Sequence, residues 1–146
     1  MPRFFTLEQA EQLLPAVEAA IREAIALQSE YQEADAERED FSRRVAMLGG
    51  MRVDRAQVTE QANRREAIAE RFKDAIEKIH ELGCLVKDLN TGLVDFPTLL
   101  DGEEVYLCWR LGEPGIRFWH GVHEGFRGRK PIDQKFLQHH QGELPN

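Results

Sequence analysis

The sequence predicts an α+β fold, a long N-terminal antiparallel helical hairpin followed by a small antiparallel sheet of about four strands. Residues 1–83 hold no convincing strand and most of the charged side chains. Residues 84–131 hold both tryptophans, the β-branched runs and most of the turn signals. This order, helices first and strands afterwards, is typical of the α+β class.

A first helix is expected to begin at Leu7, because Thr6 and Gln9 have the spacing of a capping box. Pro15 is expected to kink this helix or to restart it. Beyond Pro15 the apolar side chains keep three- and four-residue spacing, at Val17, Ile21, Ala24, Tyr31, Phe41, Val45 and Leu48. Polar residues interrupt this stripe, so we expect a long helix that is only partly buried.

A second helix is expected after the break at Gly49-Gly50. Its stripe consists of Val58, Ala62, Arg65, Ala69, Phe72, Ile76, Ile79 and Leu82. Gly83 follows in the position that suits a left-handed C-cap. At ~1.5 Å per residue each helix would run on the order of 40 Å. A small sheet cannot cover that length, so part of the hairpin is expected to protrude or to find a partner.

Turn signals divide the second half of the chain into strands. They are Asn90-Thr91-Gly92, Asp101-Gly102 and Gly112-Glu113-Pro114-Gly115. We expect strands near residues 84–89, 93–97, 104–111 and 115–122. The whole chain, 1–146, is interpreted as a single domain, with the hairpin in 1–83, the sheet in 84–131 and a loose or docked tail in 132–146.

Composition argues against two classes of partner. The formal net charge of −7 disfavours binding to nucleic acid, because phosphate binding needs a basic field. The apolar runs are too short for a membrane span, and no secretory signal is evident, so a cytoplasmic location is expected. The two cysteines, Cys84 and Cys108, lack metal-ligand spacing and are expected to be buried free thiols.

Four motifs, "VKDLNTGLVDFP", "VYLCWRLGEP", "FWH" and "GFRGRKP", resemble a bacterial family known as domain of unknown function 2203. The resemblance extends over the whole chain, from "FTLEQAEQLLP" to "GRKP". It does not extend to His123 or Glu124. The family has no established activity, so the resemblance implies membership and no particular chemistry. The motif positions that bear polar or aromatic side chains include Lys87, Asp88, Asp95, Trp109, Arg110, Glu113, Trp119, His120 and Arg129.

The turn signals also predict a strand register. A four-residue loop at 112–115 would place His120 opposite Leu107 on the apolar face, with Cys108 on the other face. A three-residue loop at 90–92 would place Asp88 among apolar neighbours and would pair Lys87 with Asp95 on a more exposed face. A slip of one residue would instead place Asp88 beside Asp95.

Two interpretations of these polar residues stay open. In the first, an Asp–His or Asp–Arg pair locks the sheet and does no chemistry, because a buried polar group needs a partner. In the second, they line a site. The candidate ligand-binding residues are Asp88, Asp95, Trp109, Arg110, Glu113 and Arg129. The candidate ligands of a divalent metal are His120, Asp88 and Glu113.

The sequence therefore leaves two classes of function. The first is a non-enzymatic interaction module, whose helical arm pairs with another protein or with a second copy. The alternative is a small-ligand or metal-binding domain in the C-terminal sheet around His120. Neither a serine-nucleophile motif nor a phosphate-binding glycine loop is present, and whether the protein is an enzyme stays open.

Overall fold

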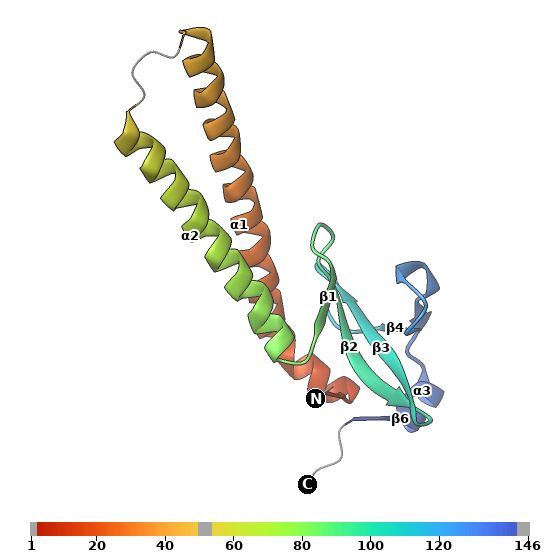
Figure 1. Cartoon of the computed structure of the whole chain (residues 1–146). Helices are drawn as coiled ribbons and strands as arrows, with labels where there is room; N and C mark the ends of the chain where they lie inside the picture. The colour runs from red at the N-terminus through yellow and green to blue at the C-terminus, as the bar shows by residue number, and fades with distance from the viewer. Residues whose placement is uncertain (1–2, 50–53, 143–146) are drawn as a thin grey trace. The chain divides into compact units, whose positions relative to one another are not determined.

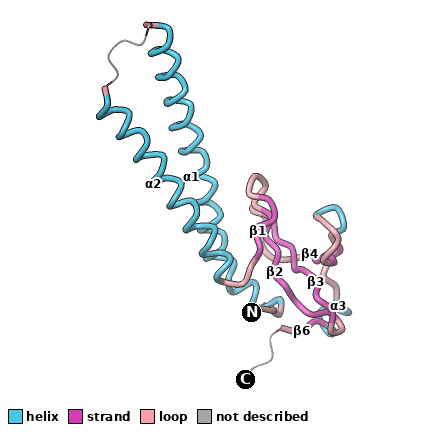
Figure 2. The backbone as a smooth tube through the Cα atoms, viewed as in Figure 1, coloured by secondary structure: helices cyan, strands magenta, loops and turns pink. Residues whose placement is uncertain are grey.

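The predicted α+β class is confirmed. A computed structural model describes residues 3–49 and 54–142 (Figure 1). Its elements are α1 (Leu7–Met47), α2 (Arg55–Glu81), β1 (Leu85–Asp88), β2 (Leu93–Leu100), β3 (Glu103–Arg110), β4 (Phe118–Gly121), the 3-10 helix η1 (Phe126–Gly128), β5 (Lys130–Pro131), α3 (Gln134–His139) and β6 (His140–Gln141). Helical and extended segments are distinguished in Figure 2.

The described residues form two compact units. One consists of the described parts of Met1–Ile21 and Ile76–Asn146 and contains the sheet. The other, Arg22–Ala75, contains the facing lengths of α1 and α2. The predicted tail begins at residue 132, and its described part contains α3 and β6.

The start of α1 confirms the predicted capping box. The backbone N–H of Thr6 donates to Gln9 Oε1 at 2.9 Å, and the N–H of Gln9 donates to Thr6 Oγ1 at 3.2 Å. The helix runs through Pro15, so the expected restart does not occur. A proline removes only one backbone hydrogen bond, and the buried residues Ala10 and Val17 anchor the helix on both sides of it. α1 ends at Met47, and Gly50 lies outside the described residues.

The end of α2 confirms the predicted glycine C-cap. Gly83 has a φ of +99°, in the left-handed region. Its N–H donates to His80 O at 2.9 Å, and the N–H of Cys84 donates to Ile79 O at 3.4 Å. These two bonds define a Schellman motif, which satisfies the last carbonyls of the helix and directs the chain into β1.

The sheet is antiparallel, with the strand order β1-β2-β3-β4-β5, and β6 pairs with β2. The four predicted strands are present. β5 and β6 were not predicted, because strands of two residues carry no alternation. β2 also continues beyond Pro97, its predicted end. The carbonyl of Pro97 accepts from Phe5 N at 2.8 Å, so the backbone polar groups of this residue face away from β3. Proline lacks an N–H, but on this side of the strand its absence costs no hydrogen bond to β3.

The predicted register of β3 with β4 was wrong by one residue. His120 pairs with Tyr106, and Trp119 pairs with Leu107. The connection is longer than the expected four-residue loop, because β3 ends at Arg110 and β4 begins at Phe118. A shift of one residue exchanges the two faces of a strand. His120 and Cys108 therefore share a face, which contradicts their predicted separation.

The predicted register of β1 with β2 was also wrong. Val86 pairs with Val94, Asp88 pairs with Leu93, and the ladder is irregular between Val86 and Asp88. Asp88 is therefore exposed, and its Oδ1 accepts from Asn90 N at 3.0 Å. The expected ion pair between Lys87 and Asp95 is absent from the ladder, where Leu85 faces Asp95.

Side chains on one face of β2 and β3 are apolar and buried. The pairs are Val94 with Trp109 and Phe96 with Leu107. The Phe5 ring meets Phe96 edge to face, at a centroid distance of 5.8 Å. Burial of such side chains supplies about 1.5–3 kcal/mol each, so this face anchors the unit.

A glycine comparison tests the packing of the first hairpin. Gly92 and Gly102 both have positive φ, +69° and +84°, but a Cβ on Gly92 would lie 2.5 Å from Leu111 Cβ, whereas a Cβ on Gly102 meets nothing within 4 Å. We expect Gly92→Ala to cost about 3 kcal/mol and Gly102→Ala about 1 kcal/mol, because only the first adds a clash to the backbone strain. Urea unfolding of both variants measures the difference, and equal losses would contradict this packing.

Candidate functional site

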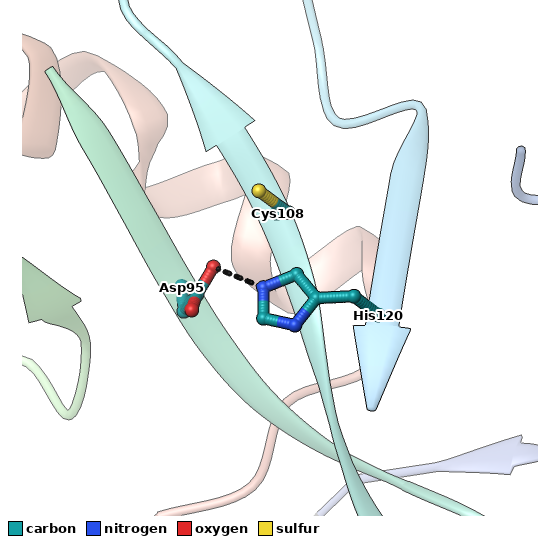
Figure 3. Close-up of side chains that lie close together, drawn as sticks. All are labelled: Asp95, Cys108 and His120. Carbon is teal, nitrogen blue, oxygen red and sulfur yellow. Dashed lines mark hydrogen bonds and ion pairs between the residues drawn. The ribbon is translucent and has the colours of Figure 1, made fainter. Parts of the chain in front are cut away.

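Three polar side chains converge on the second face of the sheet (Figure 3). They are Asp95 from β2, Cys108 from β3 and His120 from β4, exposed by 1%, 0% and 2%. Asp95 lies directly opposite Cys108, and Cys108 lies opposite Phe118, two residues before His120. One ligand atom of each side chain lies within 4.8 Å of the others. We call these three residues the Asp–Cys–His group.

The His120 ring contacts an oxygen atom at each nitrogen. Nδ1 lies 2.8 Å from Gly121 O, and Nε2 lies 3.0 Å from Asp95 Oδ1. A carbonyl oxygen only accepts, so Nδ1 must carry a proton and donate it. A second proton must lie between Nε2 and Oδ1, either on the ring or on the carboxyl, because otherwise two lone pairs would face each other. The pair therefore holds a shared proton.

Burial dominates the electrostatics of Asp95. It raises the pKa of this carboxyl above its usual value, while the charge and hydrogen bond of His120, and more weakly the Cys108 thiol and Lys87, oppose the rise. No described group donates a hydrogen bond of normal geometry to Asp95 Oδ2, which is buried. Such an unpaired buried oxygen costs about 1–3 kcal/mol.

Burial also makes Cys108 a poor nucleophile. It raises the pKa of the thiol to about 12, and the neighbouring Asp95 contributes to the rise. Only the thiolate attacks electrophiles, so this cysteine is inert as the chain stands. Cys84, outside the group, is also buried and also has its pKa raised to about 12 by burial.

Glu113 and Arg129 form a second cluster, which the structure separates from Asp88. Both Glu113 carboxylate oxygens accept from Arg129 Nη2, at 2.7 and 2.9 Å. The guanidinium lies 4.1 Å from the ring centroid of Phe118 and 4.6 Å from that of Phe126. Arg129 also donates to Cys108 O at 3.4 Å, so this cluster braces the strand that carries Cys108. These hydrogen bonds all use Nη2, and Nε of Arg129 is buried without a hydrogen-bond partner among the described residues.

The remaining candidates have structural contacts. Trp109 is buried, and its Nε1–H donates to Glu113 O at 3.0 Å. Arg110 is exposed, its backbone N–H donates to Glu113 Oε1 at 2.7 Å, and its guanidinium lies 5.7 Å from the Phe126 centroid. The cation over the Trp119 ring is Lys130, whose Nζ lies 4.6 Å from the ring centroid. Of the predicted metal ligands, only His120 belongs to the Asp–Cys–His group.

Sequence reasoning missed Cys108 as a neighbour of Asp95, although a signal was present. Asp101-Gly102 is the two-residue loop between β2 and β3, flanked by the pair Leu100 and Glu103. Counting back from that pair along both strands brings Asp95 opposite Cys108. A two-residue hairpin loop sets the register of its strands in this way.

A different surface lies within the unit Arg22–Ala75. Leu27, Ala34 and Ile68 form its buried core, with Phe72 packed against them. Nearer the connection between the helices, α1 and α2 leave a cavity of about 410 Å³. Its lining residues are Arg38, Phe41, Ser42, Val45, Val58, Gln61, Ala62 and Arg65. A second cavity of about 280 Å³ is lined by Gln28, Tyr31, Ala69 and Phe72.

Ion pairs flank this surface. Glu37 accepts from Arg64 Nη1 at 3.1 Å, and Asp35 lies 3.6 Å from Arg65 Nη1. Arg65 Nε is buried and has no hydrogen-bond partner among the described residues. These ion pairs connect the two helices, and Arg65 Nε is left as an unsatisfied donor.

The described residues have an α+β fold, with a helical hairpin and an antiparallel sheet that buries an Asp–Cys–His group. The chain belongs to the family described as "Uncharacterized conserved protein (DUF2203)", whose model matches residues 3–132. Neither a curated protein nor a solved structure matches the chain. Among the described residues, no helix has both the length and the apolar character to cross a membrane.

Removal of His120 should expose the cost of the buried carboxylate. We expect His120→Ala to lower the free energy of unfolding by about 3 kcal/mol or more, because it leaves Asp95 unpaired. The loss should grow as the pH rises above about 4. In the unfolded variant Asp95 ionises there, whereas in the folded variant the buried carboxyl has no partner and resists ionisation, so the variant's free energy of unfolding falls. Urea titrations at several pH values measure this loss. The double variant Asp95→Val/His120→Phe should recover most of the stability, and a loss equal to that of His120→Ala would contradict a coupled pair.

The thiols should react slowly until the chain unfolds. With a pKa of about 12, each thiol is about 10⁻⁴ ionised at pH 8, against about 10⁻¹ for an exposed thiol. We expect a chromogenic disulfide reagent, with chelator present, to modify the folded chain at least about 100-fold more slowly than the chain in denaturant. Fast modification of folded protein would contradict the burial of Cys84 and Cys108.

Proposed function

We propose that this protein is an interaction module that associates with a second copy of itself through the helical hairpin of residues 22–75. The observation that carries the proposal is the open length of the seam between α1 and α2. There, the cavity of about 410 Å³ is bordered by Phe41, Val45 and Val58 instead of being filled by them.

The spacing of the seam supports this proposal. The positions Leu27, Tyr31, Ala34, Arg38, Phe41, Val45 and Leu48 alternate four- and three-residue steps. The positions Val58, Ala62, Arg65, Ala69 and Phe72 do the same on α2. Such heptad patterning favours packing of several helices around one seam. The hairpin buries Leu27, Ala34 and Ile68, whereas Tyr31, Leu48 and Val58 are 38%, 64% and 42% exposed.

Two features favour a second copy as the occupant. Small residues such as Ala62 and Ala69 leave space that two helices do not fill, and two hairpins together would make a four-helix bundle around it. The borders of the seam carry both charges, with Arg38 and Arg65 near Glu37 and Asp40. A two-fold axis brings a surface against itself, so mixed charge suits self-pairing. An acidic side chain of the second copy would also satisfy Arg65 Nε.

A charge placed in the seam should separate the copies. We expect Val45→Glu to raise the dimer dissociation constant at least about tenfold, because a buried unpaired carboxylate costs more than 1.4 kcal/mol. Sedimentation equilibrium of the full chain measures the constant, with circular dichroism to verify helicity. The matched control is Ala36→Glu, which adds the same charge on the exposed side of α1 and should leave the dimer intact. A wild type that stays monomeric at every concentration would refute the proposal.

A further inference from the structure

We propose that Asp95, Cys108 and His120 form a binding site for one divalent transition-metal ion of the zinc type. The inference is independent of self-association, because the three residues belong to the unit that contains the sheet. It also differs from the donor set expected from sequence, since Asp88 and Glu113 lie elsewhere and Asp95 and Cys108 replace them.

The three donors have the chemistry that zinc selects. They offer one sulfur, one imidazole nitrogen and one carboxylate oxygen, all common zinc ligands. Bond lengths of about 2.0–2.3 Å place the donors of a tetrahedral site about 3.3–3.7 Å apart. The donor atoms here lie within 4.8 Å of one another, so side-chain movements of about 1 Å would bring them to the separations of a tetrahedral site. The thiol argues against calcium and magnesium, which take oxygen ligands.

An unsatisfied atom points to a missing partner. Asp95 is 1% exposed, and its Oδ2 has no hydrogen-bond partner of normal geometry in the described part of the chain, where the Cys108 thiol gives the carboxyl only a weak contact. Figure 3 shows this carboxylate directed toward the His120 ring, with the Cys108 sulfur close to both. A cation between the three side chains would satisfy the oxygen that the hydrogen bond to His120 leaves unpaired.

Hydrogen bonds from neighbouring groups orient the proposed ligands, as they do around known metal sites. Nδ1–H of His120 donates to Gly121 O at 2.8 Å, which leaves Nε2 as the nitrogen that faces Asp95. Ligating histidines usually donate their other ring N–H in this way. Arg129 donates to the backbone carbonyl of Cys108 at 3.4 Å, which is a further contact to the strand that carries the sulfur ligand.

Binding of the ion would release two protons. The thiol of Cys108 loses one when the sulfur coordinates the metal as thiolate. The proton shared by Asp95 and His120 is the second, because Nε2 and the carboxylate then donate their lone pairs to the ion. The three protein ligands carry two negative charges, which balance the charge of the ion, and leave a fourth position for water.

Cobalt(II) tests the site directly. Untagged full-length protein, stripped with chelator and kept reduced, is titrated with cobalt while its absorption is recorded. We expect a thiolate-to-cobalt band in the near ultraviolet that saturates at one ion per chain. A pH indicator in weak buffer should register two protons per ion. With zinc, one equivalent should remain after dialysis, measured by plasma mass spectrometry.

The two cysteines supply a matched control, because the chain contains no others. Cys84→Ser should keep the cobalt band, whereas Cys108→Ser should lose it, with circular dichroism to show that both are folded. Asp88→Asn should also keep the band. The proposal is overturned if folded wild type shows no band at excess cobalt, or if Cys108→Ser keeps the band. If Cys108→Ser does not fold, the wild-type band, its stoichiometry and its retention in Cys84→Ser decide the question.

Discussion

The pairing of β2 with β3 is the constraint on which the rest of the sheet depends. It extends over all eight residues of each strand, and the Asp101-Gly102 turn sets its register. Because side chains alternate, this register puts Phe96 and Leu107 on the apolar face and Asp95 with Cys108 on the other. A slip of one residue would bury the wrong side chains of both strands, so the core and the Asp–Cys–His group depend on the same turn.

Sequence reasoning succeeded where the signals are local. The capping box at Thr6 and the glycine C-cap at Gly83 depend on hydrogen bonds between residues at most five apart, and the spacing of residue types specifies them. Registers across longer connections failed. The segment between β3 and β4 offers no two-residue turn, and the irregularity at Lys87 leaves no mark in the residue types.

For the site, the sequence anticipated the kind of interaction and missed one partner. A buried imidazole needs an acceptor, so an Asp–His pair was among the expected outcomes. Asp95 takes the buried place predicted for Asp88 because the register of β1 with β2 differs from the predicted one. Cys108 lies on the same face as His120 because the register of β3 with β4 is shifted by one residue. The ion pair of Glu113 with Arg129 joins residues that are 16 apart, and Arg129 follows a short 3-10 helix. No periodicity in the sequence indicates such a contact.

The outer edge of β2 has a consequence for how copies of this chain can meet. β1 pairs with Leu93–Asp95, and β6 pairs with Leu99 and Leu100. Between them, the backbone N–H of Phe5 donates to the carbonyl of Pro97. Three short segments from distant parts of the sequence thus occupy nearly the whole edge, and the opposite edge is a strand of two residues. Exposed strand edges are templates for polymerisation into extended sheets. The terminal strands of this sheet, β1 and β5, are only four and two residues long. Short edge strands limit such pairing, so a crowded solution should favour discrete assemblies over fibres.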